Sequence, residues 1–331
     1  MRLTNSVWLV ATLSILLWAL TAAGQVTATV PYSVSVFATS VTGVYTQPDS
    51  IAVLGGHVFV GYGNNVSTTG SDGKSSTIVE YAMNGNVIKT YSVLGHNDGL
   101  RVNPQSKQLW ALQNEDANPN LVIIDPGTGT QSTPYTFGPT PHGGGYDDMS
   151  FRNGDVFISA SNPSNNPNTG PAIVKAEISG TTVNVSPVLL ANANATDVRS
   201  GRSVTLNLLD PDSMIFDPVG DLVLDSQSDA ELIIVRHPGF TDQSVFHLAL
   251  PVGGAKAQVD DTVFVTSSKG VILVSDRDGE TVYSISEPIF ASGAAYAATP
   301  NSVGRLNLDT GVITPIVTGM VSPHGMAFIL K

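Results

Sequence analysis

A short motif, an aspartate followed by alternating apolar residues, recurs along this 331-residue chain and limits the folds open to it. The copies are PDSIAV at Asp49, NDGLRV at Asp98, DDMSF at Asp147, PDSMIF at Asp212, VDDTVF at Asp260 and PHGMAF, where His324 replaces the aspartate. They are separated by 49, 49, 65, 48 and 64 residues. Such a period is typical of repeat architectures, in which each unit packs against its neighbours.

Each repeat has the same interior. The motif run is followed by a tight turn, a second β-rich run such as HVFVGY or VILVSD, a long polar loop, and two further runs joined by a turn. Short β-rich runs between Gly, Pro, Asn and Asp turns favour an all-β fold. We therefore predict a six-bladed β-propeller of four-stranded antiparallel blades. We expect segment 32–41 to close the ring against the C-terminal strand, and a five-bladed ring is the alternative.

The N-terminus has the order of a secretory signal peptide. Arg2 precedes an apolar run from Val7 to Leu20, and small residues follow. The run is shorter than the ~20 residues of a spanning helix, so we expect cleavage, although an uncleaved anchor is the rival interpretation. The prediction is a signal peptide over 1–24, a single propeller domain over 25–331, no membrane span after cleavage, and a secreted or periplasmic location.

Composition restricts the partners. The chain has no cysteine and a formal net charge of −12. An exported protein without disulfides depends on a large core for its stability. The negative field repels nucleic acid and anionic membranes, which leaves cations and small molecules as partners of a predicted monomer. The Gly-x-Ser-x-Gly, phosphate-loop and HExxH signatures are missing from the sequence.

One end of the predicted ring is built for binding. In a four-stranded meander, the loops after the second strand share one face with the links between blades. The long loops 63–76, 113–119 and 161–171 all fall in this set, whereas the opposite turns are tight. Binding residues concentrate in such loops. The motif residues would begin the innermost strands on the same face, around the central channel.

Several carboxylates around a channel repel one another unless a cation or protons neutralise them. A hard divalent cation, such as Ca²⁺, is the natural partner of such oxygen ligands. The predicted metal ligands are Asp49, Asp98, Asp147, Asp212 and Asp260. The predicted substrate-binding residues at the rim are His96, Asn97, His142 and Tyr146. The alternative role for each aspartate is a turn cap.

The stretch PDSMIFDPVGDLVLDS, 211–226, resembles the repeat of six-bladed regucalcin/gluconolactonase, NHL-repeat and streptogramin-lyase propellers. SPHGMAFIL, 322–330, resembles the proline-histidine-glycine form of that repeat. In gluconolactonase-like enzymes, a channel cation polarises a lactone carbonyl and a nearby acidic residue is the base. The resemblance implies that Asp212 corresponds to the aspartate of these enzymes. We predict Asp212 or His324 as the catalytic base.

Three functional hypotheses remain from the sequence. The first is an exported metal-dependent hydrolase, gluconolactonase-like, that acts on a lactone-like small molecule in the central funnel. The second is a non-catalytic propeller that binds a small molecule, glycan or protein through the long-loop face. The third is an envelope interaction module whose aspartates only cap turns. The sequence leaves open whether the protein is an enzyme.

Overall fold

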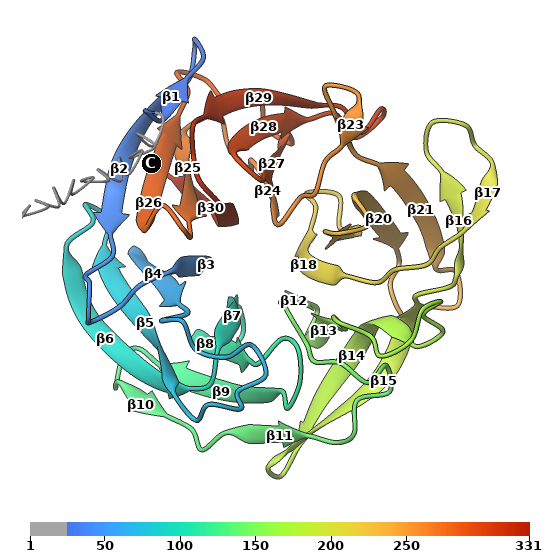
Figure 1. Cartoon of the computed structure of the whole chain (residues 1–331), viewed down its shortest axis with the longest axis horizontal. Coiled ribbons are helices and arrows are strands. Elements are labelled where there is room, and N and C mark those ends of the chain that lie inside the picture. Colours follow the sequence, from blue (N-terminus) through green and yellow to red (C-terminus); the bar gives the residue numbers. More distant parts are fainter. Residues whose placement is uncertain (1–24) are drawn as a thin grey trace, which may run out of the picture.

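The structure is a computed structural model that describes residues 25–331. The predicted signal peptide, 1–24, lies outside the described residues. Sheets of mainly antiparallel strands stand radially around a central opening, which is the architecture of a β-propeller (Figure 1). The predicted all-β propeller fold is therefore confirmed. Among the described residues we find no helix that could span a bilayer.

Six four-stranded runs, named blades 1 to 6, can be followed from the channel outwards through the described residues. Blade 1 consists of β3 (Pro48–Leu54), β4 (His57–Tyr62), β5 (Ser75–Ala82) and β6 (Val87–Leu94). Blade 2 consists of β7 (Asn97–Asn103), β8 (Gln108–Gln113), β9 (Asn120–Asp125) and β11 (Tyr135–Phe137), with β10 (Thr130–Gln131) also paired to β9.

Blades 3 and 4 also run outwards in chain order. Blade 3 consists of β12 (Met149–Arg152), β13 (Asp155–Ser159), β14 (Pro171–Ser179) and β15 (Thr182–Leu190). Blade 4 consists of β18 (Pro211–Phe216), β19 (Leu222–Ser226), β20 (Glu231–Arg236) and β21 (Ser244–Ala249), and is extended by β16 (Asn194–Asp197) and β17 (Ser203–Thr205).

Blades 5 and 6 depart from chain order. Blade 5 consists of β24 (Thr262–Phe264), β27 (Ala295–Thr299), β28 (Ser302–Leu306) and β29 (Ile313–Thr318), with β1 (Thr27–Ala28) at its edge. Blade 6 consists of β30 (Pro323–Leu330), β25 (Gly270–Asp276), β26 (Thr281–Ser286) and β2 (Ser33–Thr39). The short hairpin of β22 (Pro251–Val252) and β23 (Ala255–Lys256) forms a separate sheet.

N-terminal and C-terminal strands close the ring within blade 6, as predicted, although segment 32–41 pairs through β2 with β26 and not with the C-terminal strand β30. The interior of the Asp260 repeat was predicted wrongly. VILVSD, expected as the second strand of that blade, lies in β25 and pairs with β30 and β26, whereas β24 pairs with β27. The physical reason is the length of the available edge: β24 has three residues and β30 has eight. The β25–β26 hairpin therefore belongs to blade 6, although it lies between two strands of blade 5 in the sequence.

The core is divided among the spaces between neighbouring blades. Strand β8 shows the principle, because Leu109 and Ala111 pack towards blade 1 while Trp110 and Leu112 pack towards blade 3. Alternation along a strand places successive side chains on opposite faces. Burying one large apolar side chain contributes about 1.5–3 kcal/mol, so both faces of a blade hold it in place. This packing fixes the innermost strands, where the motif residues begin.

Candidate metal centre

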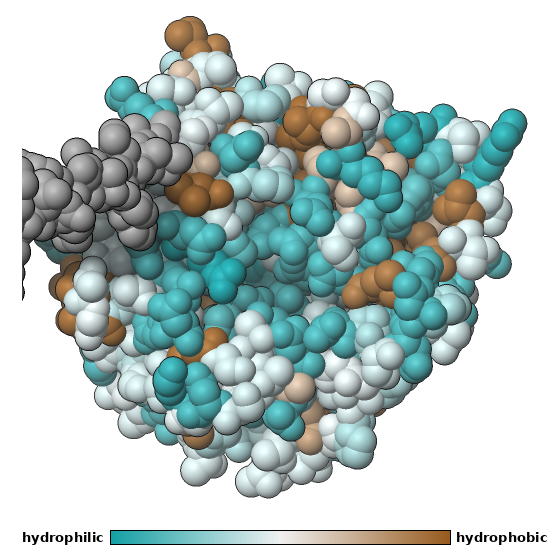
Figure 2. All heavy atoms as spheres, viewed as in Figure 1, coloured by the Kyte–Doolittle hydropathy of each residue, from teal (hydrophilic) through white to brown (hydrophobic). Residues whose placement is uncertain are grey.

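A polar cavity of about 220 Å³ lies at the channel, on the long-loop side. Its wall combines the starts of the innermost strands with loops that follow second strands. All six motif residues line it: Asp49, Asp98, Asp147, Asp212, Asp260 and His324. In the view down the ring, hydrophilic side chains gather over the centre (Figure 2). Radial repetition therefore brings together residues that are far apart in the sequence.

The cavity is strongly acidic. Its carboxylates are Asp49, Asp98, Glu115, Asp116, Asp147, Asp148, Asp210, Asp212, Asp260 and Asp261, and its arginines are Arg101 and Arg277. Burial raises the pKa of Asp49, Asp147 and Asp212 well above the usual aspartate range, and neighbouring carboxylates raise it further. The negative charge of such a cluster favours the binding of cations.

Asp98, Asp147 and Asp212 form a group of three carboxylates contributed by three blades. Their possible ligand atoms all lie within 4.8 Å of one another. Asp147 is only 8% exposed, and its carboxyl group faces those of Asp98 and Asp212. Three carboxylate ligands match the preference of hard divalent cations such as Ca²⁺ or Mg²⁺ for oxygen. The residues therefore fit the predicted type of ion.

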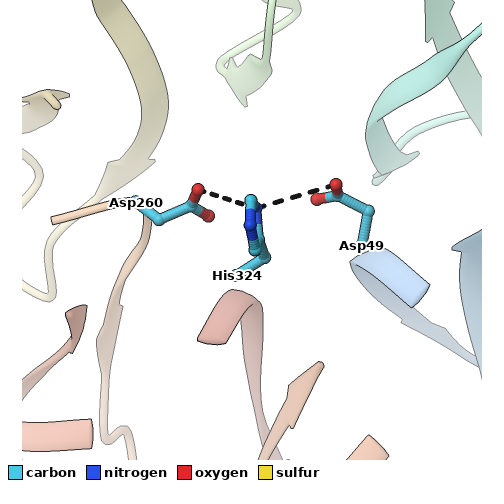
Figure 3. A group of neighbouring side chains, drawn as sticks. All are labelled: Asp49, Asp260 and His324. Carbon is cyan, nitrogen blue, oxygen red and sulfur yellow. Dashed lines mark ion pairs between the residues drawn. The ribbon is translucent and has the colours of Figure 1, made fainter. Parts of the chain in front are cut away.

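His324 lies between two of the predicted ligands (Figure 3). Its Nδ1 is 2.8 Å from Oδ1 of Asp260 and 3.7 Å from Oδ2 of Asp49, and its Nε2 is 3.1 Å from Oγ of Ser322. Burial favours the neutral ring, but Asp260 and Asp49 outweigh it and raise the pKa of His324 to about 10. This side chain is therefore an imidazolium that pairs closely with Asp260 and more distantly with Asp49.

The second member of each aspartate pair has a structural role. Asp148 binds the guanidinium of Arg101 and accepts a 2.9 Å hydrogen bond from the N–H of Met214. Asp261 accepts a 2.6 Å hydrogen bond from the N–H of Met326. Both members of each pair line the cavity, but the second also ties down the innermost strand of the following blade. The second aspartate thus adds a structural role to its place in the cavity wall.

Among the predicted substrate-binding residues, only His96 lines the cavity. Asn97 is buried, and its amide donates to the carbonyls of Gly99 and Leu112. His142 is buried, with Nε2 2.6 Å from the carbonyl oxygen of Gly145.

Tyr146 packs in the core between blades 2 and 3, and its ring lies 5.3 Å from that of His142. The alternation that turns Asp98 and Asp147 towards the cavity turns their predecessors Asn97 and Tyr146 away from it. The prediction that Asn97, His142 and Tyr146 contact a substrate in the cavity is therefore wrong.

The sequence interpretation missed several cavity residues, among them Glu115, Arg101 and Arg277. Glu115 belongs to the loop after β8, and its Oε2 lies 3.5 Å from Nε2 of His96. Arg101 lies in β7 and Arg277 directly follows β25. These residues do not recur at equivalent positions of the repeat. Only their positions in a long loop or an inner strand could have predicted that they lie at this end of the channel.

No family model and no curated protein matches the chain. Among solved structures, virginiamycin B lyase from Staphylococcus aureus aligns with a TM-score of 0.51 and 13% identity, covering 90% of this chain and 96% of that one. The periplasmic gluconolactonase from Pseudomonas aeruginosa aligns with a TM-score of 0.51 and 12% identity, covering 90% and 99%.

A protein of unknown function from Bacteroides caccae aligns with a TM-score of 0.50 and 9% identity, covering 86% of this chain and 87% of that one. At these identities the likeness is one of fold. It confirms that the chain has the propeller architecture of the streptogramin-lyase and gluconolactonase type. Fold does not assign an activity, which has to be argued from the cavity.

Proposed function

We propose that the protein is an exported, divalent-cation-dependent hydrolase that acts on a lactone-like small molecule in the acidic cavity. The observation that carries the proposal is the triad of Asp98, Asp147 and Asp212, whose ligand atoms lie within 4.8 Å of one another in the cavity wall. The shared fold with a periplasmic gluconolactonase supports the choice of reaction. Export over residues 1–24, a single domain over 25–331 and a monomeric state remain part of the proposal.

A cation held by the Asp98 and Asp147 members of the triad would polarise a substrate carbonyl and lower the pKa of a bound water. Asp98 and Asp147 are assigned as ligands. Asp212 is the better of the two predicted bases, because its carboxyl oxygen lies within 4.8 Å of the ligand atoms of Asp98 and Asp147 and could accept a proton from a water bound there. His324 holds its proton beside Asp260 and Asp49, and its role is to neutralise and orient that side of the cavity.

The test is hydrolysis of glucono-δ-lactone and a panel of lactones and esters, with Ca²⁺, Mg²⁺ or Mn²⁺ and with chelator. Asp212→Asn is expected to lower kcat/KM by about 100-fold or more while the melting temperature stays within a few degrees of wild type. Asp242→Asn is the matched control, because that carboxylate is 67% exposed and lies outside the cavity. Absence of turnover with every cation and substrate class would contradict the proposal.

Non-catalytic binding of a cationic small molecule is the second candidate. It is favoured by the excess of carboxylates over the two arginines in the cavity wall. Calorimetric titration with spermidine in chelator would distinguish it. Micromolar binding that Ca²⁺ displaces, without turnover of any lactone or ester, would favour this function over hydrolysis.

A further inference from the structure

A second group of possible metal ligands lies on the blade 2 side of the cavity. His96 immediately precedes β7, Asp98 lies within β7, and Glu115 lies in the loop after β8. Their possible ligand atoms all lie within 4.8 Å of one another. Asp98 also belongs to the Asp98, Asp147 and Asp212 triad, so one carboxylate is common to both groups.

His96 is held in the orientation of a metal ligand. The residue is only 2% exposed, and its Nδ1 lies 3.0 Å from the carbonyl oxygen of Val66. A carbonyl only accepts, so Nδ1 carries the hydrogen and the Nε2 lone pair of the neutral ring is directed to the other side. A ring nitrogen that donates to a carbonyl, with the opposite nitrogen free, is the usual arrangement of a metal-bound histidine.

The surrounding backbone is shaped around this ring. A Cβ added to Gly63 would lie 2.8 Å from Cε1 of His96, so only glycine leaves the ring its place. The N–H of His96 donates to Oδ1 of Asn114 over 2.9 Å, and the N–H of Asn114 donates to the carbonyl of His96 over 2.8 Å. The imidazole is therefore fixed before any ligand binds.

Glu115 faces the free nitrogen without bonding to it. The separation between Nε2 of His96 and Oε2 of Glu115 is 3.5 Å, and Oε2 is buried without a hydrogen-bond partner within residues 25–331. A protonated histidine next to a carboxylate would be expected to donate across a shorter distance. Two ligands at about 2.0–2.1 Å from a tetrahedral ion lie roughly 3.3 Å apart, which is close to the observed spacing.

We infer that His96, Asp98 and Glu115 form a second cation site, and that Asp98 bridges it to the first. An imidazole with carboxylates suits Zn²⁺ or Mn²⁺ better than Ca²⁺, which prefers oxygen ligands throughout. The cavity thus holds a transition-metal position beside a hard-cation position. The bridge depends on the triad assigned under the proposed function, whereas the His96 site itself does not.

The experiment is calorimetric and absorption titration of the chelator-treated full chain with Co²⁺, a spectroscopic substitute for Zn²⁺. Wild type is expected to bind two equivalents. His96→Gln and Glu115→Gln should each reduce this to one and change the Co²⁺ absorption spectrum, and Asp147→Asn should also leave one. His57→Gln is the matched control, because His57 pairs with Glu80 at 2.5 Å outside the cavity.

Thermal melts of the metal-free variants establish that each is folded. One equivalent that Asp147→Asn abolishes and His96→Gln leaves unchanged overturns the second site and leaves the proposed function standing. One equivalent that His96→Gln abolishes and Asp147→Asn leaves unchanged supports the second site, and the triad is then tested by titration with Ca²⁺ and Mg²⁺. No bound Co²⁺ in wild type overturns the second site, and no bound Ca²⁺ or Mg²⁺ overturns the first.

Discussion

Nδ1 of His324 lies 2.8 Å from Oδ1 of Asp260, which connects the C-terminal strand of blade 6 to the start of blade 5 across the acidic cavity (Figure 3). The two residues are equivalent positions of one repeat, brought together by closure of the ring. The same closure gathers the other motif aspartates, so charge is concentrated where the fold leaves a cavity. Repulsion among these carboxylates therefore links the stability of the fold to the binding of cations in the cavity.

Asp147→Asn is expected to change stability in opposite directions with and without metal. In chelator, it removes one carboxylate from a buried cluster of like charge and should raise the free energy of unfolding by about 1 kcal/mol. In saturating Ca²⁺, wild type should be the more stable protein, because the variant loses a ligand. Urea denaturation in both conditions measures this, with Asp242→Asn as control. A variant that is less stable in both conditions would contradict repulsion in the metal-free cluster.

Arg101→Met should leave Asp148 buried without its charged partner. The side chain of Asp148 is 5% exposed, and loss of one partner from a buried ion pair costs about 3–5 kcal/mol. Adding Asp148→Asn should restore part of the lost free energy of unfolding. Lys175→Met is the control, since the exposed Lys175 to Asp155 pair, at 2.7 Å, should contribute less than about 1 kcal/mol. Equal losses at the two sites would refute the structural role of Asp148.

Gly145→Ala should disturb the Glu115 loop. A Cβ at this position would lie 2.2 Å from the carbonyl oxygen of Glu115, and relieving such a contact costs roughly 1–3 kcal/mol. Both the melting temperature and the affinity for Co²⁺ should fall. Gly138→Ala is the matched control, because no heavy atom lies within 4 Å of its added Cβ. If Gly145→Ala melted at the wild-type temperature, as Gly138→Ala should, the Glu115 loop would accommodate the added Cβ and the prediction would be wrong.

His247→Gln should reveal a pH-dependent contribution to stability. Glu231 and Asp197 outweigh burial and raise the pKa of His247, whose Nδ1 lies 3.3 Å from Oδ2 of Asp197. The folded state thus binds this proton more tightly than the unfolded chain does.

The stabilisation is fully present below the unfolded pKa of about 6.5 and is lost as pH rises through the folded-state pKa. The loss on substitution should be about 0.5–1 kcal/mol at pH 5.5 and smaller at pH 9. Urea denaturation at the two pH values measures it, with the exposed His237→Gln as control. A loss that grows with pH would have the wrong sign.

The spacing of the motif was sufficient to predict the propeller and the end of the channel where the aspartates meet. It did not predict that Tyr146 and Asn97 turn away from the cavity, although strand alternation next to Asp147 and Asp98 carries that information. Glu115 could not be identified as a ligand, because one glutamate in a polar loop has no pattern. Its significance comes from the 3.5 Å approach to His96, which joins the start of one strand to a loop beyond the next.

The sequence by itself determined the strands, the turns and the face that carries the aspartates, because alternation, turn residues and repeat spacing act over a few residues or recur at a fixed interval. Only the tertiary structure decided which strand edges pair. β25 could hydrogen bond to any open edge, and the eight residues of β30 offer it a longer ladder than the three residues of β24. The same closure placed His324 between Asp260 and Asp49, since backbone ladders are generic and side-chain packing between blades is specific.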